Sequence, residues 1–282
     1  MITINNLDFS YKNVAVFKNI SLEFKEGNVY GLLGENGVGK TTLLKLICGL
    51  QFPKNGTCAV DEFIPSERNP YFLQNIFYLP EEVITEDTTP EKFINKIGVF
   101  YPRYDYPYFL NLMKELEVDP SRKFNAMSYG QKKKSLLACA LSLRTDYLLL
   151  DEPTNGLDIP SKALFRKVIL QHSTDAENNL PTIIISTHQV KDVENLIDPI
   201  VILDQDEVLL NATFEEISEK LYFDYGSEKA DDALYTEMIP GGYINVIQNK
   251  FGMESKVNVE ALFNAVRNNK KVIREIFAVG KN

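Results

Sequence analysis

The sequence predicts an α/β fold, in which a largely parallel sheet is joined by an inserted helical segment and followed by a small α+β extension. Residues 147–150 and 182–185 form two almost wholly apolar runs, which are typical of strands covered on both faces of a parallel sheet. A glycine-rich loop at residues 34–39 lies between an apolar run and a helical pattern. Two carboxylates follow the run at 147–150 directly, and the carboxyl end of a buried strand is where α/β proteins place functional side chains.

Strand and helix patterns alternate along the first part of the chain. Residues 1–30 alternate between apolar and polar positions in the manner of strands, and residues 41–50 carry leucines at helical spacing. Residues 88–143 are mostly helical in pattern, and we expect Pro102, Pro107 and Pro120 to interrupt them. Short apolar runs at 200–203 and 208–210 predict two more strands.

The pattern changes after residue 211. A possible strand at 243–247 and a possible helix at 257–266 predict a small mixed unit there. We therefore expect a main domain over residues 1–217, which includes a helical subdomain at about 85–143, and a C-terminal extension over residues 218–282.

The composition is that of a globular protein with an acidic surface. The chain has 282 residues, 44% of them hydrophobic, and a formal net charge of −9. The longest apolar run, residues 136–141, is far shorter than the roughly 20 residues of a membrane-spanning helix, and the N-terminus does not resemble a signal peptide. The acidity disfavours binding to nucleic acid, because phosphate contacts require a basic surface. The three cysteines form no CxxC pair and are expected to be reduced thiols in the cytosol.

Residues 34–41 match the P-loop pattern, in which backbone N–H groups surround nucleotide phosphates. We expect Lys40 to reach the β- and γ-phosphates and the Thr41 hydroxyl to bind Mg²⁺. The alternative, a glycine-rich turn without function, is disfavoured by the strand before the loop and the helix after it. The predicted phosphate-binding residues are Gly34, Glu35, Asn36, Gly37, Val38, Gly39, Lys40, Thr41 and Thr42.

Three polar side chains follow two further buried strands. Asp151 is expected to be a partner of Mg²⁺, and Glu152 to be the general base that takes a proton from the attacking water. His188 follows the run at 182–185 and should lie at the same sheet edge as Lys40 and Glu152. A capping carboxylate pair and a structural histidine are the simpler interpretations, and both lose weight in a chain that also carries a P-loop.

Two further motifs connect these residues to a known family. Residues 127–131 are Met-Ser-Tyr-Gly-Gln, and residues 151–158 are Asp-Glu-Pro-Thr-Asn-Gly-Leu-Asp. Together with the P-loop and His188, they resemble the nucleotide-binding subunit of ATP-binding cassette (ABC) transporters over residues 1 to about 217. The short helical segment, the pair at 155–156 and the extension resemble bacterial exporter-type systems whose permease is a separate chain.

The resemblance implies an ABC-type P-loop NTPase fold with a mixed sheet core, an antiparallel β subdomain and an inserted helical subdomain. It implies that Tyr11 stacks on adenine, that Glu81 stands where the family has a Mg²⁺-sensing glutamine, and that Asp158 lies at a dimer interface. It also implies that a signature segment contacts the ATP of a partner subunit. The signature residues are Ser128, Tyr129, Gly130 and Gln131, with Tyr129 in place of a glycine.

The residues after the signature should begin a helix capped by Ser128. The lysine run at 132–134 would then lie in its first turn, and we expect it to face phosphate or solvent rather than nucleic acid.

The implied activity is ATP hydrolysis with ATP and Mg²⁺, in a dimer of two copies paired head to tail. That dimer would drive a separate transmembrane permease from the cytoplasmic face of the membrane. An acidic segment over residues 81–91 could receive a basic helix of the permease, although a solvated loop would show the same charges. Two rival functions are an ABC-type ATPase acting on ribosomes or DNA and a nucleotide-gated module that hardly hydrolyses ATP.

Overall fold

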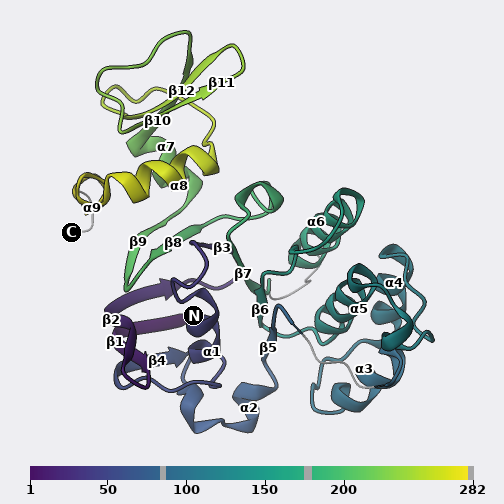
Figure 1. The fold of residues 1–282 in the computed structure, drawn as a ribbon. Coiled ribbons are helices and arrows are strands. Elements are labelled where there is room, and N and C mark those ends of the chain that lie inside the picture. Colours follow the sequence, from purple (N-terminus) through teal and green to yellow (C-terminus); the bar gives the residue numbers. More distant parts are fainter. Residues whose placement is uncertain (83–86, 175–179, 279–282) are drawn as a thin grey trace.

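The centre of the protein is a six-stranded mixed sheet (Figure 1). A computed structural model describes residues 1–82, 87–174 and 180–278. The strands are parallel except for the last, which runs antiparallel to its neighbour. In spatial order they are β5 (Ile76–Leu79), β6 (Tyr147–Asp151), β7 (Thr182–Thr187), β3 (Val29–Leu33), β8 (Ile200–Asp204) and β9 (Glu207–Ala212).

The central strands are buried along their whole length, as their apolar runs predict. Every residue of β6, β7 and β8 is buried. Because parallel neighbours end at one edge, the registers Leu33–Thr187 and Asp151–Ser186 bring the chain segments after β3, β6 and β7 together. This edge is where the predicted site residues lie.

A second, antiparallel sheet covers the helix that follows the P-loop. It is formed by β2 (Val14–Phe24), β1 (Ile2–Tyr11) and β4 (Asn55–Val60), in that order. The inward-facing residues Ile2, Ile4 and Phe17 join one hydrophobic core with Leu43 and Leu44 of α1 (Lys40–Ile47). The structure therefore confirms the antiparallel subdomain.

The inserted helical segment contains α3 (Pro90–Gly98), α4 (Tyr106–Glu115) and α5 (Tyr129–Ser142). Its predicted start at residue 85 lies outside the described residues. The expectation that Pro107 interrupts a helix is wrong, because Pro107 lies in the first turn of α4, where a proline N–H would have no helical partner. Asp105 caps this helix by accepting a hydrogen bond from the Tyr108 N–H. Among the helices outside the segment, α2 (Pro70–Leu73) and α6 (Ile159–Thr174) were not predicted.

The C-terminal extension has its own antiparallel sheet in the order β10 (Leu221–Gly226), β12 (Gly242–Gln248) and β11 (Tyr235–Ile239). The predicted strand lies inside β12, and the predicted helix overlaps α8 (Val259–Asn268). The expected boundary at residue 217 falls within α7 (Phe214–Lys220), and the chain ends with α9 (Lys270–Ala278).

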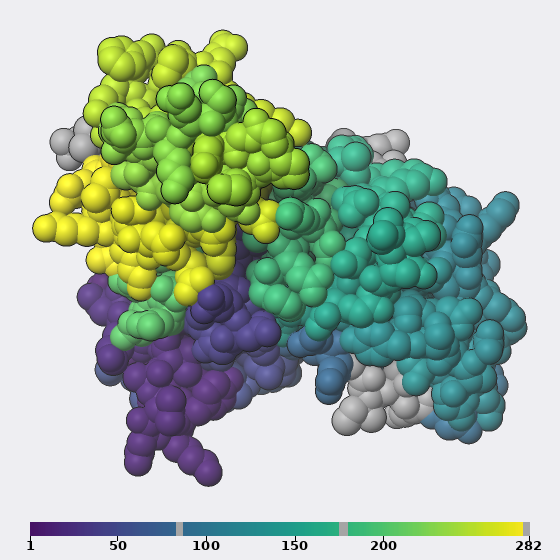
Figure 2. Space-filling model, turned by 45° about the horizontal axis from the view of Figure 1, so that its top comes forward, coloured from purple at the N-terminus to yellow at the C-terminus, as the bar shows by residue number. Residues whose placement is uncertain are grey.

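The helices of the extension face the main domain. Figure 2 shows α8 and α9, in yellow, between the green sheet of the extension and the purple N-terminal strands. Ion pairs join Arg267 to Glu35 in the P-loop and Lys270 to Asp204 at the end of β8, the second at 2.7 Å. A third joins Glu260 to Lys191 in the short 3₁₀ helix that follows His188. The extension therefore contacts segments on both sides of the predicted site.

No helix in the part of the chain that the structure describes is long and apolar enough to span a membrane.

Candidate active site

The P-loop connects β3 to α1 and requires glycine at defined positions. Gly39 has a φ of +106°, and a Cβ atom there would lie 2.7 Å from the Cζ atom of Phe17. Gly37 also has a positive φ, +85°, but a Cβ atom there would meet no heavy atom within 4 Å. Only Gly39 therefore combines the left-handed backbone with a close approach, so any side chain there would displace the buried ring of Phe17.

Lys40 is buried and contacts both the loop and a carboxylate. Its Nζ atom donates hydrogen bonds to the carbonyl oxygens of Gly34 and Glu35, at 2.8 and 3.0 Å. The same atom lies 3.3 Å from Oε1 of Glu152. The ammonium group is thus held at the mouth of the loop, where it can reach an anionic ligand.

Asp151 is the centre of a buried group of oxygen atoms. Its Oδ2 atom accepts hydrogen bonds from the Thr41 hydroxyl at 2.8 Å and from the Tyr78 hydroxyl at 3.0 Å. Its Oδ1 atom accepts from the Ser186 hydroxyl at 2.5 Å. Burial and the neighbouring Asp151 raise the pKa of Tyr78 far above its usual range, so this phenol stays a neutral donor.

These oxygen atoms fit Mg²⁺. Mg²⁺ in P-loop proteins is held by one or two side-chain oxygens together with nucleotide phosphates and water. Thr41 and Asp151 supply such a hydroxyl and carboxylate in direct contact. Within the described residues, no group of three or more His, Cys, Asp or Glu side chains could hold a metal ion. The donor set therefore suits a metal shared with a nucleotide, but not a closed protein metal site.

Glu152 and His188 face each other at the end of the sheet. The Nδ1 atom of His188 lies 2.9 Å from Oε1 of Glu152, the same oxygen that faces Lys40. The Glu152 side chain is 8% exposed, and that of His188 is 30% exposed. The structure thus brings Lys40, Glu152 and His188 together at one carboxylate oxygen, at the sheet edge where the sequence places them.

Tyr11 reaches from the antiparallel sheet to Thr42 in the P-loop helix. Tyr11 ends β1, is 43% exposed and packs edge-on against Phe9, with the ring centroids 4.9 Å apart. The Thr42 hydroxyl lies 3.4 Å from the Tyr11 hydroxyl. An exposed ring beside the P-loop is placed where a nucleotide base could stack.

The signature residues begin α5. Ser128 is the N-cap, as predicted: its hydroxyl accepts a hydrogen bond from the Gln131 N–H, and the Gln131 side chain accepts one from the Ser128 N–H. The ring of Tyr129 lies on Gly156, so a Cβ atom there would come within 2.6 Å of it. A Cβ atom at Gly130 would touch only Leu157, at 3.7 Å.

The three lysines at 132–134 do not all face solvent. The expectation that all of residues 132–134 face phosphate or solvent is wrong for Lys133. Its Nζ atom donates a hydrogen bond to the carbonyl oxygen of Glu152 at 2.7 Å, within the same chain.

Glu81 and Asp158 both have partners in their own chain. Glu81 accepts a hydrogen bond from the Asn155 amide at 2.6 Å. Asp158 accepts one from the Ser161 N–H at 2.8 Å at the start of α6, and hydrogen bonds from Ser161 lower the pKa of this carboxyl.

The acidic segment at 81–91 is partly neutralised. Asp87 pairs with Lys123 at 2.9 Å and also accepts a hydrogen bond from Asn125, while Glu91 accepts one from the Tyr106 hydroxyl. Glu86, the remaining carboxylate of the segment after residue 82, lies outside the described residues. Asp87 therefore has a cationic partner, whereas the partner of Glu91 is a neutral hydroxyl.

Four residues at the site were missed by the sequence analysis. Ser186 and Tyr78 contact Asp151, Lys133 contacts Glu152, and Asn155 contacts Glu81. Ser186 could have been found, because it lies between the apolar run at 182–185 and His188, and it is in register with Asp151. The other three contacts join segments whose spacing in the sequence predicts nothing about their distance in space.

The fold and the site define a P-loop nucleotide triphosphatase. A glycine-rich loop at a helix N-terminus is suited to phosphates, and a hydroxyl and a carboxylate beside it suit Mg²⁺. A second carboxylate, that of Glu152, contacts the lysine of the loop.

Comparison with known proteins identifies the family. A family model described as ABC transporter matches residues 17–155. The chain is 31% identical to the ABC transporter ATP-binding protein NatA of Bacillus subtilis, over 80% of this chain and 91% of that protein. It is 29% identical to the ABC transporter ATP-binding protein YtrB of the same organism, over 93% of this chain and 97% of that protein. The chain belongs to the family of ABC transporter ATP-binding proteins, and it is an ATPase.

A solved structure supports the fold. A dimeric post-hydrolysis state of the ATP-binding cassette MJ0796, bound to ADP and Pi, matches with a TM-score of 0.67. The match covers 76% of this chain and 98% of that chain at 22% identity.

Proposed function

We propose that Glu152 is the general base of ATP hydrolysis and that Lys40, His188, Thr41 and Asp151 complete the site. The observation that carries this proposal is the meeting of Lys40 and His188 at Oε1 of Glu152. Mg²⁺, when bound with ATP, would neutralise charge that develops on the phosphates. Thr41 and Asp151 would hold it, while Glu152 takes a proton from water and His188 keeps the carboxylate oriented.

We also propose that the complete site forms between two copies of the chain. One chain supplies one P-loop and one signature, and Figure 1 shows α1 and α5 in different lobes of the molecule. The N-terminus of α5 and Ser128 would contact the γ-phosphate held by the P-loop of the partner, where the helix dipole favours an anion. Asp158 would lie at that interface.

The permease is proposed to dock in an apolar groove. A groove of about 480 Å³ lies between α2, β5 and α3, and Leu50 and Phe100 at its rim are 49% and 68% exposed. We propose that a cytoplasmic helix of a separate permease fills it, because amphipathic helices bind such grooves through their apolar face. The ion pair between Asp87 and Lys123 offsets part of the charge of the acidic segment and favours this groove over that segment as the docking site. Phe100→Asp should abolish copurification of the permease, and unchanged copurification would exclude the groove.

We propose that the ATPase works at the cytoplasmic face of the membrane. Export is the proposed direction, on the resemblance to exporter-type chains in the short helical segment, the Asn155-Gly156 pair and the extension. We propose that residues 1–217 form the motor and that residues 218–282 pack on it as an accessory unit.

Replacing Glu152 tests the proposed base and the dimer together. Glu152→Gln should hydrolyse no ATP and should elute as an ATP-dependent dimer in size-exclusion chromatography, because ATP is bound but not consumed. Glu62→Gln, which neutralises an exposed carboxylate outside the site, is the matched control and should behave as the unmodified protein. Rapid turnover by Glu152→Gln would refute the role of the base.

A second candidate is a nucleotide-gated module with little turnover. Two observations favour it, the bulky Tyr129 in the signature and the carboxylate at position 81. A steady-state ATPase assay of the unmodified chain separates the two: turnover near 1 s⁻¹ or above is typical of an enzyme.

A further inference from the structure

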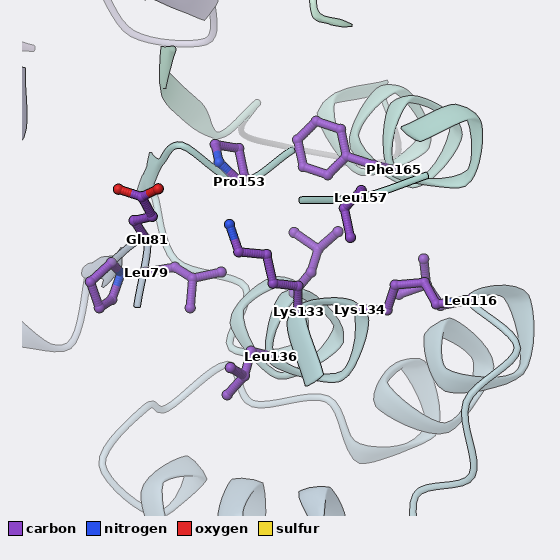
Figure 3. A pocket seen from close by; sticks show the side chains of 11 residues that line it. Leu79, Glu81, Leu116, Lys133, Lys134, Leu136, Pro153, Leu157 and Phe165 are labelled. Carbon is purple, nitrogen blue, oxygen red and sulfur yellow. The ribbon is translucent and has the colours of Figure 1, made fainter. Parts of the chain in front are cut away.

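The side chain of Lys133 extends from the helical segment to Glu152, the residue that follows β6. Lys133 is the fifth residue of α5, and its stem lies in a pocket lined by Leu79, Leu136, Pro153, Leu157 and Phe165 (Figure 3). Figure 3 shows the Nζ atom pointing toward Pro153, the residue after Glu152. Its hydrogen bond to the Glu152 carbonyl oxygen is 2.7 Å long.

Glu152 needs support at its backbone. Its φ is +44°, a left-handed conformation that a residue with a side chain seldom adopts and that persists only when neighbouring contacts hold it. Its N–H donates to the carbonyl oxygen of Ser186 at 3.0 Å, which ties it to β7. Its carbonyl oxygen accepts from Lys133 at 2.7 Å and from the Asn155 N–H, in the turn that follows, at 3.2 Å. These bonds hold the peptide groups on both sides of the left-handed residue, and the bond from Lys133 ties the carbonyl to the helical segment.

The surroundings of Lys133 keep its ammonium group directed at this carbonyl. Burial lowers the pKa of Lys133, while Glu81 and Glu152 favour the charged form. The Nζ atom also lies 5.3 Å from the centre of the Tyr129 ring, and that ring rests on Gly156. The contacts of Lys133 and Tyr129 join α5 to the segment after β6. The hydrogen bond between Asn155 and Glu81 joins that segment to the one after β5.

We propose that Lys133 is a positioning residue, which fixes the backbone of Glu152 from the helical segment and thereby couples movement of that segment to the alignment of the base. The inference rests on the proposed role of Glu152. It predicts a loss in the chemical step, because the carboxylate is displaced, while nucleotide binding at the P-loop is retained.

Substitution by methionine isolates the polar contact. Lys133→Met keeps a stem of similar length in the apolar pocket and removes the donor. We expect kcat to fall about 10- to 100-fold, the range that follows from a small displacement of a catalytic group. KM for MgATP should change by no more than about twofold, because Lys133 contacts neither the P-loop nor Thr41. Lys133→Arg, which restores a charged donor, should recover most of the lost kcat.

The control lies one residue away in the same turn. Lys132→Met removes the same charge from α5, and we expect a smaller loss of kcat than in Lys133→Met. Lys133→Leu, which also has no donor, carries the same prediction as Lys133→Met should the latter fail to fold, and Tm is measured for all variants.

An unchanged kcat in Lys133→Met, an equal loss in Lys132→Met, or no recovery in Lys133→Arg would overturn the inference. The variant Glu152→Gln separates this failure from failure of the proposed base: if it abolishes turnover while Lys133→Met does not, only the coupling is wrong. If Glu152→Gln turns over normally, the role of Glu152 is wrong, and the coupling falls with it.

Discussion

The contact between Tyr129 and Gly156 can be tested by adding one methyl group. In Gly156→Ala, the new Cβ atom would lie 2.6 Å from Cε1 of Tyr129, on a backbone with φ +75°. The left-handed conformation alone costs about 1–2 kcal/mol for alanine. Displacing the ring adds about 1 kcal/mol, the low end for overpacking, because Tyr129 is 48% exposed and can move outward. We therefore expect Gly156→Ala to lower the free energy of unfolding by about 2–3 kcal/mol.

A double-mutant cycle separates the two contributions. In a Tyr129→Gly background the ring is absent, so Gly156→Ala should cost only the backbone part, about 1–2 kcal/mol. The cost of glycine in the first turn of α5 is common to both arms and cancels. Urea unfolding followed by circular dichroism measures all four proteins. An equal cost of Gly156→Ala in both backgrounds would refute the packing of the ring on Gly156.

Two further outcomes follow from burial and from the extension. Burial raises the pKa of Cys48 to about 11 and that of Cys58 to about 12, so at pH 8 their thiolates are scarce and thiol reagents should label the folded protein slowly. Labelling should become fast on unfolding in urea, and fast labelling of the folded protein would contradict the burial of both thiols. The pair Arg267–Glu35 is partly exposed, and a double-mutant cycle with Arg267→Ala and Glu35→Gln should give a coupling energy of about 0.2–1 kcal/mol in urea unfolding. A coupling of zero would mean that the extension is not tied to the P-loop at this point.

Much of the core sheet is predictable from the sequence, because its strands are buried on both faces. Residues 147–150 and 182–185 carry only apolar or small polar side chains, so the sequence alone predicts that both strands are buried. The edge strand β5 was missed because three of its four residues are only partly buried and the pattern is weak over so short a segment. The helix α6 was overlooked although Phe165, Val168, Ile169 and His172 follow the i, i+3, i+4, i+7 pattern of one helix face and are all buried.

The P-loop residues and the strand-end carboxylates are predictable for a similar reason. Parallel strands end at one edge, so Asp151, Glu152 and His188 could be placed near Lys40 without a structure. The position of Lys133 could not be derived, because its direction depends on how the helical segment packs against the sheet. The same holds for the ring of Tyr129, which needs the left-handed Gly156 beneath it.

The most direct test of the account is complementation between two inactive chains. Lys40→Ala damages the P-loop and leaves the signature intact, whereas Ser128→Arg damages the signature and leaves the P-loop intact. If the site forms between two copies, half of the dimers in an equal mixture are mixed, and each has one intact site of two. The mixture should then recover about a quarter of the ATPase activity of the unmodified protein, while each variant alone is inactive. A mixture no more active than its components would contradict a site shared between two chains.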